Sequence, residues 1–196
     1  MPRIAVTLLG VLCFGLPWVR AERRGVIFYA GFEGSADATA AAGEKKADLE
    51  GKAANFEPGL QGQALRAGDG EARPKYAGPG NVTTPEGTIE MWVKPLDWVP
   101  PVWGFHIYFR GDGEGGSILV YKYGHMAGDH LAYFSDGKGG VTMMTGGAHR
   151  AWNPAGKWHH LVTTWSPNEL RFYVDGARGK AVPFKTPFTN KIRSFF

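Results

Sequence analysis

The residues best suited to chemistry lie in and just beyond one aromatic stretch near the middle of the chain. Trp98, Trp103 and His106 occur close together there, and Asp112 and Tyr123 follow soon after. A sugar binds by stacking the apolar face of its ring on an aromatic side chain, while nearby polar groups fix its orientation. These five residues are therefore the candidate carbohydrate-binding set. The alternative is that the two tryptophans cap one end of a hydrophobic core.

Acidic residues in glycine-rich turns offer a second kind of chemistry. Asp112 and Glu114 share one such turn, and Asp129 and Asp136 lie in or beside two others. Calcium prefers several carboxylate and carbonyl oxygens supplied by loops. The four acids are therefore candidate calcium ligands, although their spacing matches no EF-hand loop. Solvent-exposed turn acids are the commoner explanation of such a pattern.

The pair His159-His160 is a poorer candidate for a metal or catalytic site. Neighbouring residues of a β-strand point to opposite faces of the sheet, so two adjacent histidines cannot easily bind one ion. We therefore expect this pair to belong to a structural strand.

The elements that must position these residues are short β-strands separated by turns. Residues 158–165 are rich in β-branched and aromatic types. In the next strand Leu170, Phe172 and Val174 alternate with more polar residues, which predicts one buried and one outward face. Asp175-Gly176 predicts a type I′ turn, because glycine accepts a positive φ at no steric cost.

A third firm strand covers residues 88–94, with Ile89, Met91 and Val93 on the core face and Trp92 on the other. The 29 glycines and 13 prolines suit many turns, and no βαβ pattern occurs. The sequence thus predicts an all-β fold, an antiparallel two-sheet β-sandwich of the jelly-roll kind. Further strands are expected at 26–32, 63–65, 75–76, 106–110, 117–123, 130–135 and 141–145.

Three blocks of sequence carry a family resemblance. The first joins Trp158–Val162 (WHHLV) to Leu170–Gly176 (LRFYVDG), and the second is Gly87–Pro95 (GTIEMWVKP). A weaker third block joins Phe32–Gly34 (FEG) to Gly59–Leu65 (GLQGQAL). Together they resemble the concanavalin A-like lectin/glucanase superfamily, in its laminin-G-like and pentraxin-like branch. The resemblance implies a jelly roll from about residue 26 to 180, and it identifies no ligand because this fold hosts many functions.

The resemblance also raises an enzymatic alternative. Glucanases of this superfamily carry catalytic carboxylates that alternate on one strand as E-x-D-x-x-E, and glycoside hydrolysis needs such a pair. Here Glu90 is the only acid on its strand; position 92 is Trp and position 94 is Lys. The sequence therefore predicts no catalytic residues and a non-catalytic, lectin-like recognition domain. A protein-interaction module of a larger extracellular protein and a glucanase-like hydrolase are the alternatives.

Composition limits the partners of such a domain. The chain has 22 Lys and Arg against 18 Asp and Glu, and no cluster of basic residues indicates nucleic-acid binding. The only cysteine, Cys13, precedes the predicted domain, so no disulfide is expected within it. The expected partner is a glycan or an extracellular protein.

Residues 1–21 have the features of a secretory signal peptide. Arg3 precedes an apolar run over residues 4–16, which is too short for a comfortable membrane span, and a small residue stands at Ala21. We predict cleavage after Ala21, a secreted or extracytoplasmic location, and no transmembrane segment after cleavage. An uncleaved membrane anchor is the alternative.

The C-terminal residues are expected to pack least well. Residues 183–196 contain Pro183 and Pro187, and they lack the closing strands that the resemblance implies. The predicted domain therefore spans residues 22–182, and a poorly packed tail follows at 183–196. On this interpretation the strand at 26–32 also loses a neighbour and leaves an exposed edge.

Overall fold

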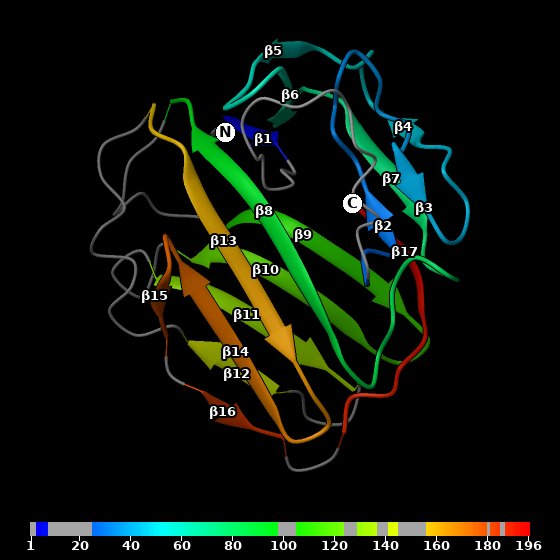
Figure 1. Ribbon diagram of the computed structural model, residues 1–196, viewed down its shortest axis with the longest axis vertical. Helices are drawn as coiled ribbons and strands as arrows, with labels where there is room; N and C mark the ends of the chain where they lie inside the picture. Colours follow the sequence, from blue (N-terminus) through cyan, green and yellow to red (C-terminus); the bar gives the residue numbers. More distant parts are fainter. Residues whose placement is uncertain are drawn as a thin grey trace, which may run out of the picture.

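The described elements of the computed structural model are all β-strands (Figure 1). The structure describes residues 3–7, 25–97, 105–123, 129–136, 141–144, 156–179, 181–184 and 187–196, of which 3–7, 123, 129 and 141–144 are described as backbone alone. The strands are β1 (Arg3–Thr7), β2 (Phe28–Tyr29), β3 (Ala40–Ala41), β4 (Asp48–Glu50), β5 (Phe56–Pro58), β6 (Gln63–Gly68), β7 (Arg73–Ala77), β8 (Gly87–Pro95), β9 (Phe105–Gly113), β10 (Ser117–Tyr123), β11 (Asp129–Ser135), β12 (Val141–Met144), β13 (His159–Trp165), β14 (Glu169–Val174), β15 (Ala177–Arg178), β16 (Val182–Pro183) and β17 (Ile192–Phe195).

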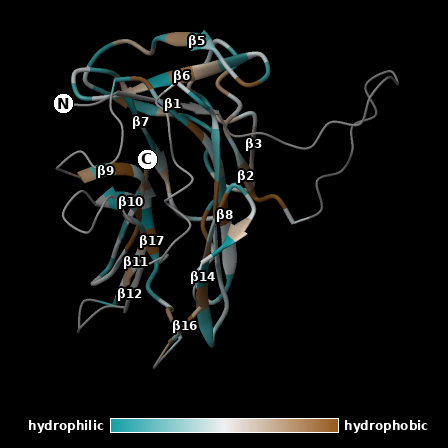
Figure 2. Cartoon of the chain, turned by 90° about the vertical axis from the view of Figure 1, so that its left-hand side faces the viewer, coloured by the Kyte–Doolittle hydropathy of each residue, from teal (hydrophilic) through white to brown (hydrophobic). Residues whose placement is uncertain are grey.

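The strands form two large sheets that face each other across the core. The eight-stranded sheet has the order β15-β14-β13-β8-β1-β6-β5, with β16 also paired to β14. The seven-stranded sheet has the order β12-β11-β10-β9-β17-β7-β4, and β2 pairs with β3 in a small third sheet. Figure 2 shows the two layers edge-on, with β8 and β14 on one side and β9 to β12 on the other. Adjacent strands pair in the antiparallel sense, so the predicted all-β antiparallel sandwich is confirmed.

The regularly alternating strands form as the sequence predicts. Leu170, Phe172 and Val174 of β14 are 0%, 0% and 1% exposed, since this side of the strand faces the second sheet. The two-residue turn after them has φ values of 51° at Asp175 and 76° at Gly176, as a type I′ hairpin requires. The strand pairs β13–β14 and β8–β13 therefore have a continuous antiparallel register, as their regular alternation predicts.

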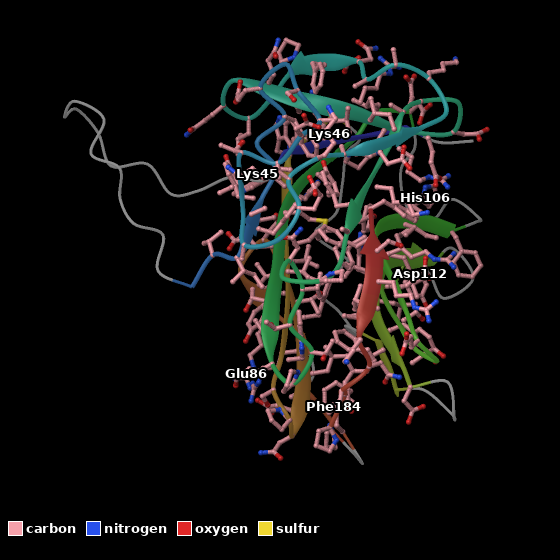
Figure 3. The ribbon with its side chains drawn as sticks, turned by 90° about the vertical axis from the view of Figure 1, so that its right-hand side faces the viewer. Lys45, Lys46, Glu86, His106, Asp112 and Phe184 are labelled. Atoms are coloured by element: carbon pink, nitrogen blue, oxygen red, sulfur yellow. The ribbon has the colours of Figure 1, made fainter. Side chains whose placement is uncertain are left out.

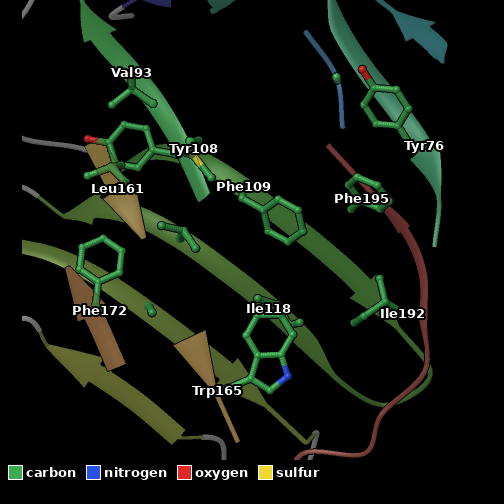
Figure 4. Close-up of a cluster of buried hydrophobic side chains, with 14 of the residues drawn as sticks. Tyr76, Val93, Tyr108, Phe109, Ile118, Leu161, Trp165, Phe172, Ile192 and Phe195 are labelled. Atoms are coloured by element: carbon green, nitrogen blue, oxygen red, sulfur yellow. The ribbon is translucent and has the colours of Figure 1, made fainter. Parts of the chain in front are cut away.

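The core between the sheets is filled largely by aromatic rings (Figure 4). Phe195 lies at the centre of one group, with its ring centroid 4.9 Å from Phe28, 5.3 Å from Tyr76 and 5.6 Å from Phe109. The Tyr76 hydroxyl donates a 2.6 Å hydrogen bond to the carbonyl of Ala36, and burial raises its pKa. These rings tie the last strand of the chain to β2, β7 and β9.

The prediction of a poorly packed tail at 183–196 is wrong, and so is a domain that ends at residue 182. Residues 192–195 form β17, which lies inside the seven-stranded sheet between β9 and β7. Phe188, Ile192 and Phe195 are only 4%, 4% and 5% exposed. Pro183 is tolerated because it ends a two-residue strand at the edge of the other sheet, where its missing N–H costs little.

An irregularity in pairing hides β17 from a reading of the sequence pattern. The register with β9 shifts between Ile192 and Ser194, so two buried residues three positions apart, Ile192 and Phe195, both face the core. Glycines flank the strand closely: a Cβ on Gly78 would lie 2.1 Å from the Ile192 carbonyl oxygen, and one on Gly113 would lie 2.2 Å from that of Lys191. The strand therefore needs glycine on both neighbours.

The N-terminal residues also contribute a strand. Arg3–Thr7 forms β1 in the eight-stranded sheet, between β6 and β8, although it belongs to the stretch predicted to be removed as a signal peptide. No helix in the described part of the chain is long and apolar enough to cross a membrane. Cleavage after Ala21 stays a prediction.

Replacing Phe172 tests the assigned faces of β14. Phe172→Ala should lower the free energy of unfolding by about 3–5 kcal/mol, because it leaves a cavity in the packed core. Arg171→Ala, on the outward face beside Glu169, should cost less than about 1 kcal/mol. Denaturant unfolding of both variants measures the difference, and equal losses would show that the faces are assigned wrongly.

Candidate functional site

A single irregularity in the pairing of β9 with β10 arranges the candidate site. Val120 lies opposite Phe109, but the next residue of β10, Tyr121, lies opposite Ile107, so the register skips Tyr108. Tyr108 and Phe109 both join the buried core as a result. In residues 105–108, which precede Phe109, the inward-facing and outward-facing positions are therefore the reverse of those that regular alternation from Phe109 would give.

The reversal turns Phe105 outward and creates an exposed aromatic surface on the seven-stranded sheet. Phe105 is 61% exposed, and its ring centroid lies 5.6 Å from that of Tyr121 at an angle of 35°. Tyr121 is only 9% exposed, so it is largely buried beside the more exposed ring of Phe105. Together with Ile107, Leu119 and Tyr133 on the same outer face, these residues are called the Phe105 surface below.

An exposed charged pair lies further along the same face of β9. The Nε of Arg110 donates to both carboxylate oxygens of Asp112 at 2.9 Å, and Arg110 lies opposite Leu119 of the Phe105 surface. Each side chain is about half exposed. The face therefore passes from aromatic rings at one end to hydrogen-bonding groups at the other.

Polar residues lie buried beneath the Phe105 surface, on the core side of the same three strands. Lys122 is opposite His106 on one side and His130 on the other, and their exposed fractions are 0%, 3% and 0%. The hydroxyl of Tyr108 lies 3.1 Å from His130 Nε2, and the two rings are stacked. These contacts hold β9, β10 and β11 together under the exposed face.

Burial shifts the pKa values of two of these buried residues, Lys122 and His106. It lowers the pKa of Lys122 to about 8, because the ammonium loses its hydration. It also lowers the pKa of His106 to about 4, with a further contribution from the positive charge of Lys122 that Asp97 partly offsets. At neutral pH His106 is therefore an uncharged side chain of the core.

The structure does not bring the five predicted sugar-binding residues together. His106 points into the core, so its assignment to a sugar-contacting surface is wrong; Asp112 is on the outer face (Figure 3). Tyr123 is opposite Phe105 at the far end of β10, about 20 Å along the strand from Asp112 at ~3.3 Å per residue, and its side chain is not described. Trp98 and Trp103 lie outside the described residues.

Sequence reasoning missed Phe105 and Tyr121, the exposed aromatic ring and the buried ring beside it. Simple alternation along β9 would put Phe105, Ile107 and Phe109 on one face, and the burial of Phe109 would then imply a buried Phe105. Only the register of β10 reveals the bulge. The available signal was the position of Phe105, directly beyond the aromatic segment that contains Trp98 and Trp103.

The four predicted calcium ligands are also dispersed. The carboxylate of Asp112 pairs with Arg110, and Glu114 lies 2.7 Å from Arg193, whose hydrogen bond and positive charge lower the pKa of Glu114. Asp129 begins β11 opposite Tyr123, at the other end of the sheet from Asp112 and Asp136. Among the side chains that the structure describes, no three His, Cys, Asp or Glu gather closely enough to hold a metal ion.

The acid considered for hydrolysis, Glu90, lies on the outer face of the other sheet. Its Oε1 is 2.8 Å from Nε2 of His160, and the His160 ring stacks on Trp92 with centroids 4.7 Å apart. His159 faces the core and its Nδ1 lies 2.7 Å from Oδ2 of Asp175. The two histidines therefore point to opposite faces of β13, as the sequence predicts.

Comparison with known proteins places this fold in a family. A family model described as the concanavalin A-like lectin/glucanases superfamily matches residues 69–194, which is more than half of the chain. The chain belongs to this superfamily. A search among curated proteins finds no match.

Two solved structures show what the superfamily domain is similar to. Domain 4 of AbnA, a GH43 extracellular arabinanase from Geobacillus stearothermophilus in complex with arabinotriose, has a TM-score of 0.66 and 17% sequence identity, over 87% of this chain and 81% of that one. Domains LG4-5 of the mouse laminin alpha1 chain have a TM-score of 0.48 and 13% identity, over 62% of this chain and 30% of that one. At such identities the first likeness shows the shared fold, and the second carries no further argument.

The buried residues His106 and Lys122 should make the free energy of unfolding depend on pH. Between pH 6.5 and about 4 the unfolded chain binds a proton at His106 that the folded chain does not, so the free energy of unfolding should decrease by up to about 1.4 kcal/mol for each unit by which the pH is lowered. Between pH 8 and 10.5 the unfolded chain similarly keeps a proton that folded Lys122 loses, so stability should rise with pH.

Urea unfolding across this range checks both limbs. His106→Gln should flatten the acid limb and Lys122→Met the alkaline limb, whereas Lys157→Met, at an exposed lysine, should change neither. An acid limb unchanged in His106→Gln would mean that His106 is not the group responsible.

Proposed function

We propose that the chain is a secreted, non-catalytic, carbohydrate-binding domain of its superfamily, and that sugar binds at the Phe105 surface. The observation that carries the proposal is the 61% exposed ring of Phe105 beside Tyr121 on a paired, well-packed sheet. Exposing a large aromatic side chain has no benefit for folding. A sugar ring stacked on Phe105 would remove that surface from water.

The rest of the face suits a sugar chain longer than one ring. The Arg110–Asp112 pair supplies hydrogen-bond donors and acceptors some distance along the sheet from the aromatic end. An oligosaccharide laid across β9, β10 and β11 could contact both regions, with stacking for affinity and polar contacts for orientation. The similar arabinanase domain was solved with arabinotriose, which supports an oligosaccharide as the ligand class.

The non-catalytic part of the proposal rests on the carboxylates. A glycosidase of the usual kind needs two acids about 5–10 Å apart across the scissile bond. Glu90 is the only acid on β8, and its carboxylate contacts His160. The signal-peptide features of residues 1–21 support export of the domain.

Affinity measurements with a single-residue variant test the site. Screening the full chain on a glycan array identifies a ligand, with arabinotriose as the first soluble probe. Phe105→Ala should weaken binding about tenfold, or ~1.4 kcal/mol, because the stacking platform is lost. Tyr173→Ala, which removes a half-buried aromatic ring from the outer face of the other sheet, should leave affinity unchanged.

Two results would contradict the proposal. One is equal affinity of Phe105→Ala and the unchanged chain for the glycan. The other is no glycan binding at all together with Phe105-dependent capture of a protein, which would establish the protein-interaction alternative. Titration in the presence of a chelator separates a calcium-dependent from a calcium-independent site.

Absence of hydrolysis is tested directly. The purified full chain should release no reducing sugar from β-glucans or arabinan above the buffer background, because no second carboxylate accompanies Glu90 on its strand. Turnover that disappears in Glu90→Gln would establish the hydrolase alternative.

A further inference from the structure

Of the strands that the structure describes, β1 alone joins two parts of the eight-stranded sheet. It pairs with β6 from Arg3↔Gly68 to Val6↔Leu65, and with β8 from Ile4↔Pro95 to Thr7↔Trp92. In the strand order β6 and β8 are not neighbours, and among the described strands the β5–β6 hairpin reaches the rest of this sheet only through β1. The backbone edges of β6 and β8 are thus one strand apart and face each other.

The strand in this position comes from a segment with the sequence features of a removable signal peptide. Removing it would leave two parallel rows of unpaired N–H and C=O groups on β6 and β8. Such edges readily pair with another polypeptide. The sheet then holds a gap shaped for one antiparallel strand.

A large cavity continues this strand position beyond the end of β1. It has a volume of about 1750 Å³, and its lining includes Gly87–Met91, Val26–Ala30 with Ala67 and Gly68, and Phe105–Arg110 of the facing sheet. β1 reaches only as far as Trp92 of β8, and no other described strand pairs with that edge of residues 87–91. A longer strand could therefore run on past Thr7 along β8.

The two neighbouring strands define the side chains that an occupant needs. The position of Val6 is opposite Leu65 and Val93, which are 2% and 0% exposed, so an apolar residue is required there. The adjacent position, that of Ala5, is opposite Arg66 and Lys94, which are half-buried on the other face. Arg66 already pairs with Glu57 and Glu71, so the position suits a small residue, or an acidic one that pairs with Lys94.

We propose that the position between β6 and β8 is an acceptor site for an extended strand of another polypeptide. The occupant is a segment of five or more residues, apolar at alternate positions and small or acidic between them. Main-chain hydrogen bonds to both edges supply affinity, and the alternate side chains supply specificity. In the unprocessed chain β1 occupies the same site. The strand position between β6 and β8 is in the other sheet from the Phe105 surface, although residues 105–110 also line the adjoining cavity.

Strand exchange in the folded full chain tests the acceptor site. A protease recognition sequence placed between residues 14 and 20 lets the link behind β1 be cut after folding. The cut protein is then incubated, in urea below its unfolding midpoint, with a fluorescent peptide that has the sequence of residues 1–8. Gel filtration and mass spectrometry measure the bound peptide per chain.

Two variant peptides of equal charge, Ala5→Glu and Val6→Glu, are compared with the peptide of native sequence. The peptide of native sequence and its Ala5→Glu variant should both bind at one per chain. Val6→Glu should bind at least tenfold more weakly, because it places a carboxylate against the buried Leu65 and Val93. Bound native peptide should also raise the melting temperature of the cut chain, since it reconnects β6 to β8.

Three outcomes would overturn the proposal. The first is no binding of the native peptide. The second is equal binding of the Ala5→Glu and Val6→Glu peptides, which would indicate adsorption to an apolar surface without strand register. The third is pairing of cut chains into dimers that exclude the peptide, which would make a second copy the occupant.

Discussion

The register skip at Tyr108 is the constraint on which the candidate site depends. Because β9 has one more residue than β10 at this point, two consecutive side chains, Tyr108 and Phe109, can both enter the core. The residues before them must then take the faces opposite to those expected from Phe109. Phe105 turns to solvent and His106 turns inward, so one backbone irregularity produces both the exposed aromatic ring and the buried polar row. Bulges near functional surfaces commonly redirect side chains in this way.

The last strand of the chain supports the same region from the other side of β9. The amide and carbonyl of Arg110 exchange two 3.0 Å hydrogen bonds with Phe196, and Phe195 packs its ring against Phe109. The ring of Phe109 and the backbone of Arg110 are thus both held by the C-terminal residues Phe195 and Phe196. A change that detached β17 would therefore disturb the Arg110–Asp112 pair as well as the core.

Regular alternation made much of the fold predictable, and irregular pairing made the rest unpredictable. The strands β8, β13 and β14 have one apolar face, so their limits, their buried residues and the turn at Asp175-Gly176 follow from sequence alone. The family resemblance rested on these same strands and is confirmed. By contrast, β9 and β17 each contain a register shift, and it is there that His106 was assigned to the wrong face and the C-terminal residues to a loose tail. A register depends on the partner strand, which is distant in sequence for β17 and invisible in the pattern of either strand by itself.

Thiol labelling measures the central claim, the orientation of β9 before the bulge, most directly. With Cys13 replaced by Ser, a cysteine is introduced either at position 105 or at position 106, and the rate of reaction with a soluble thiol reagent is compared in the folded protein. The structure requires Phe105→Cys to react roughly tenfold or more faster than His106→Cys, because thiol reactivity follows access to solvent. Equal rates, or faster labelling at position 106, would contradict the bulge and with it the Phe105 surface.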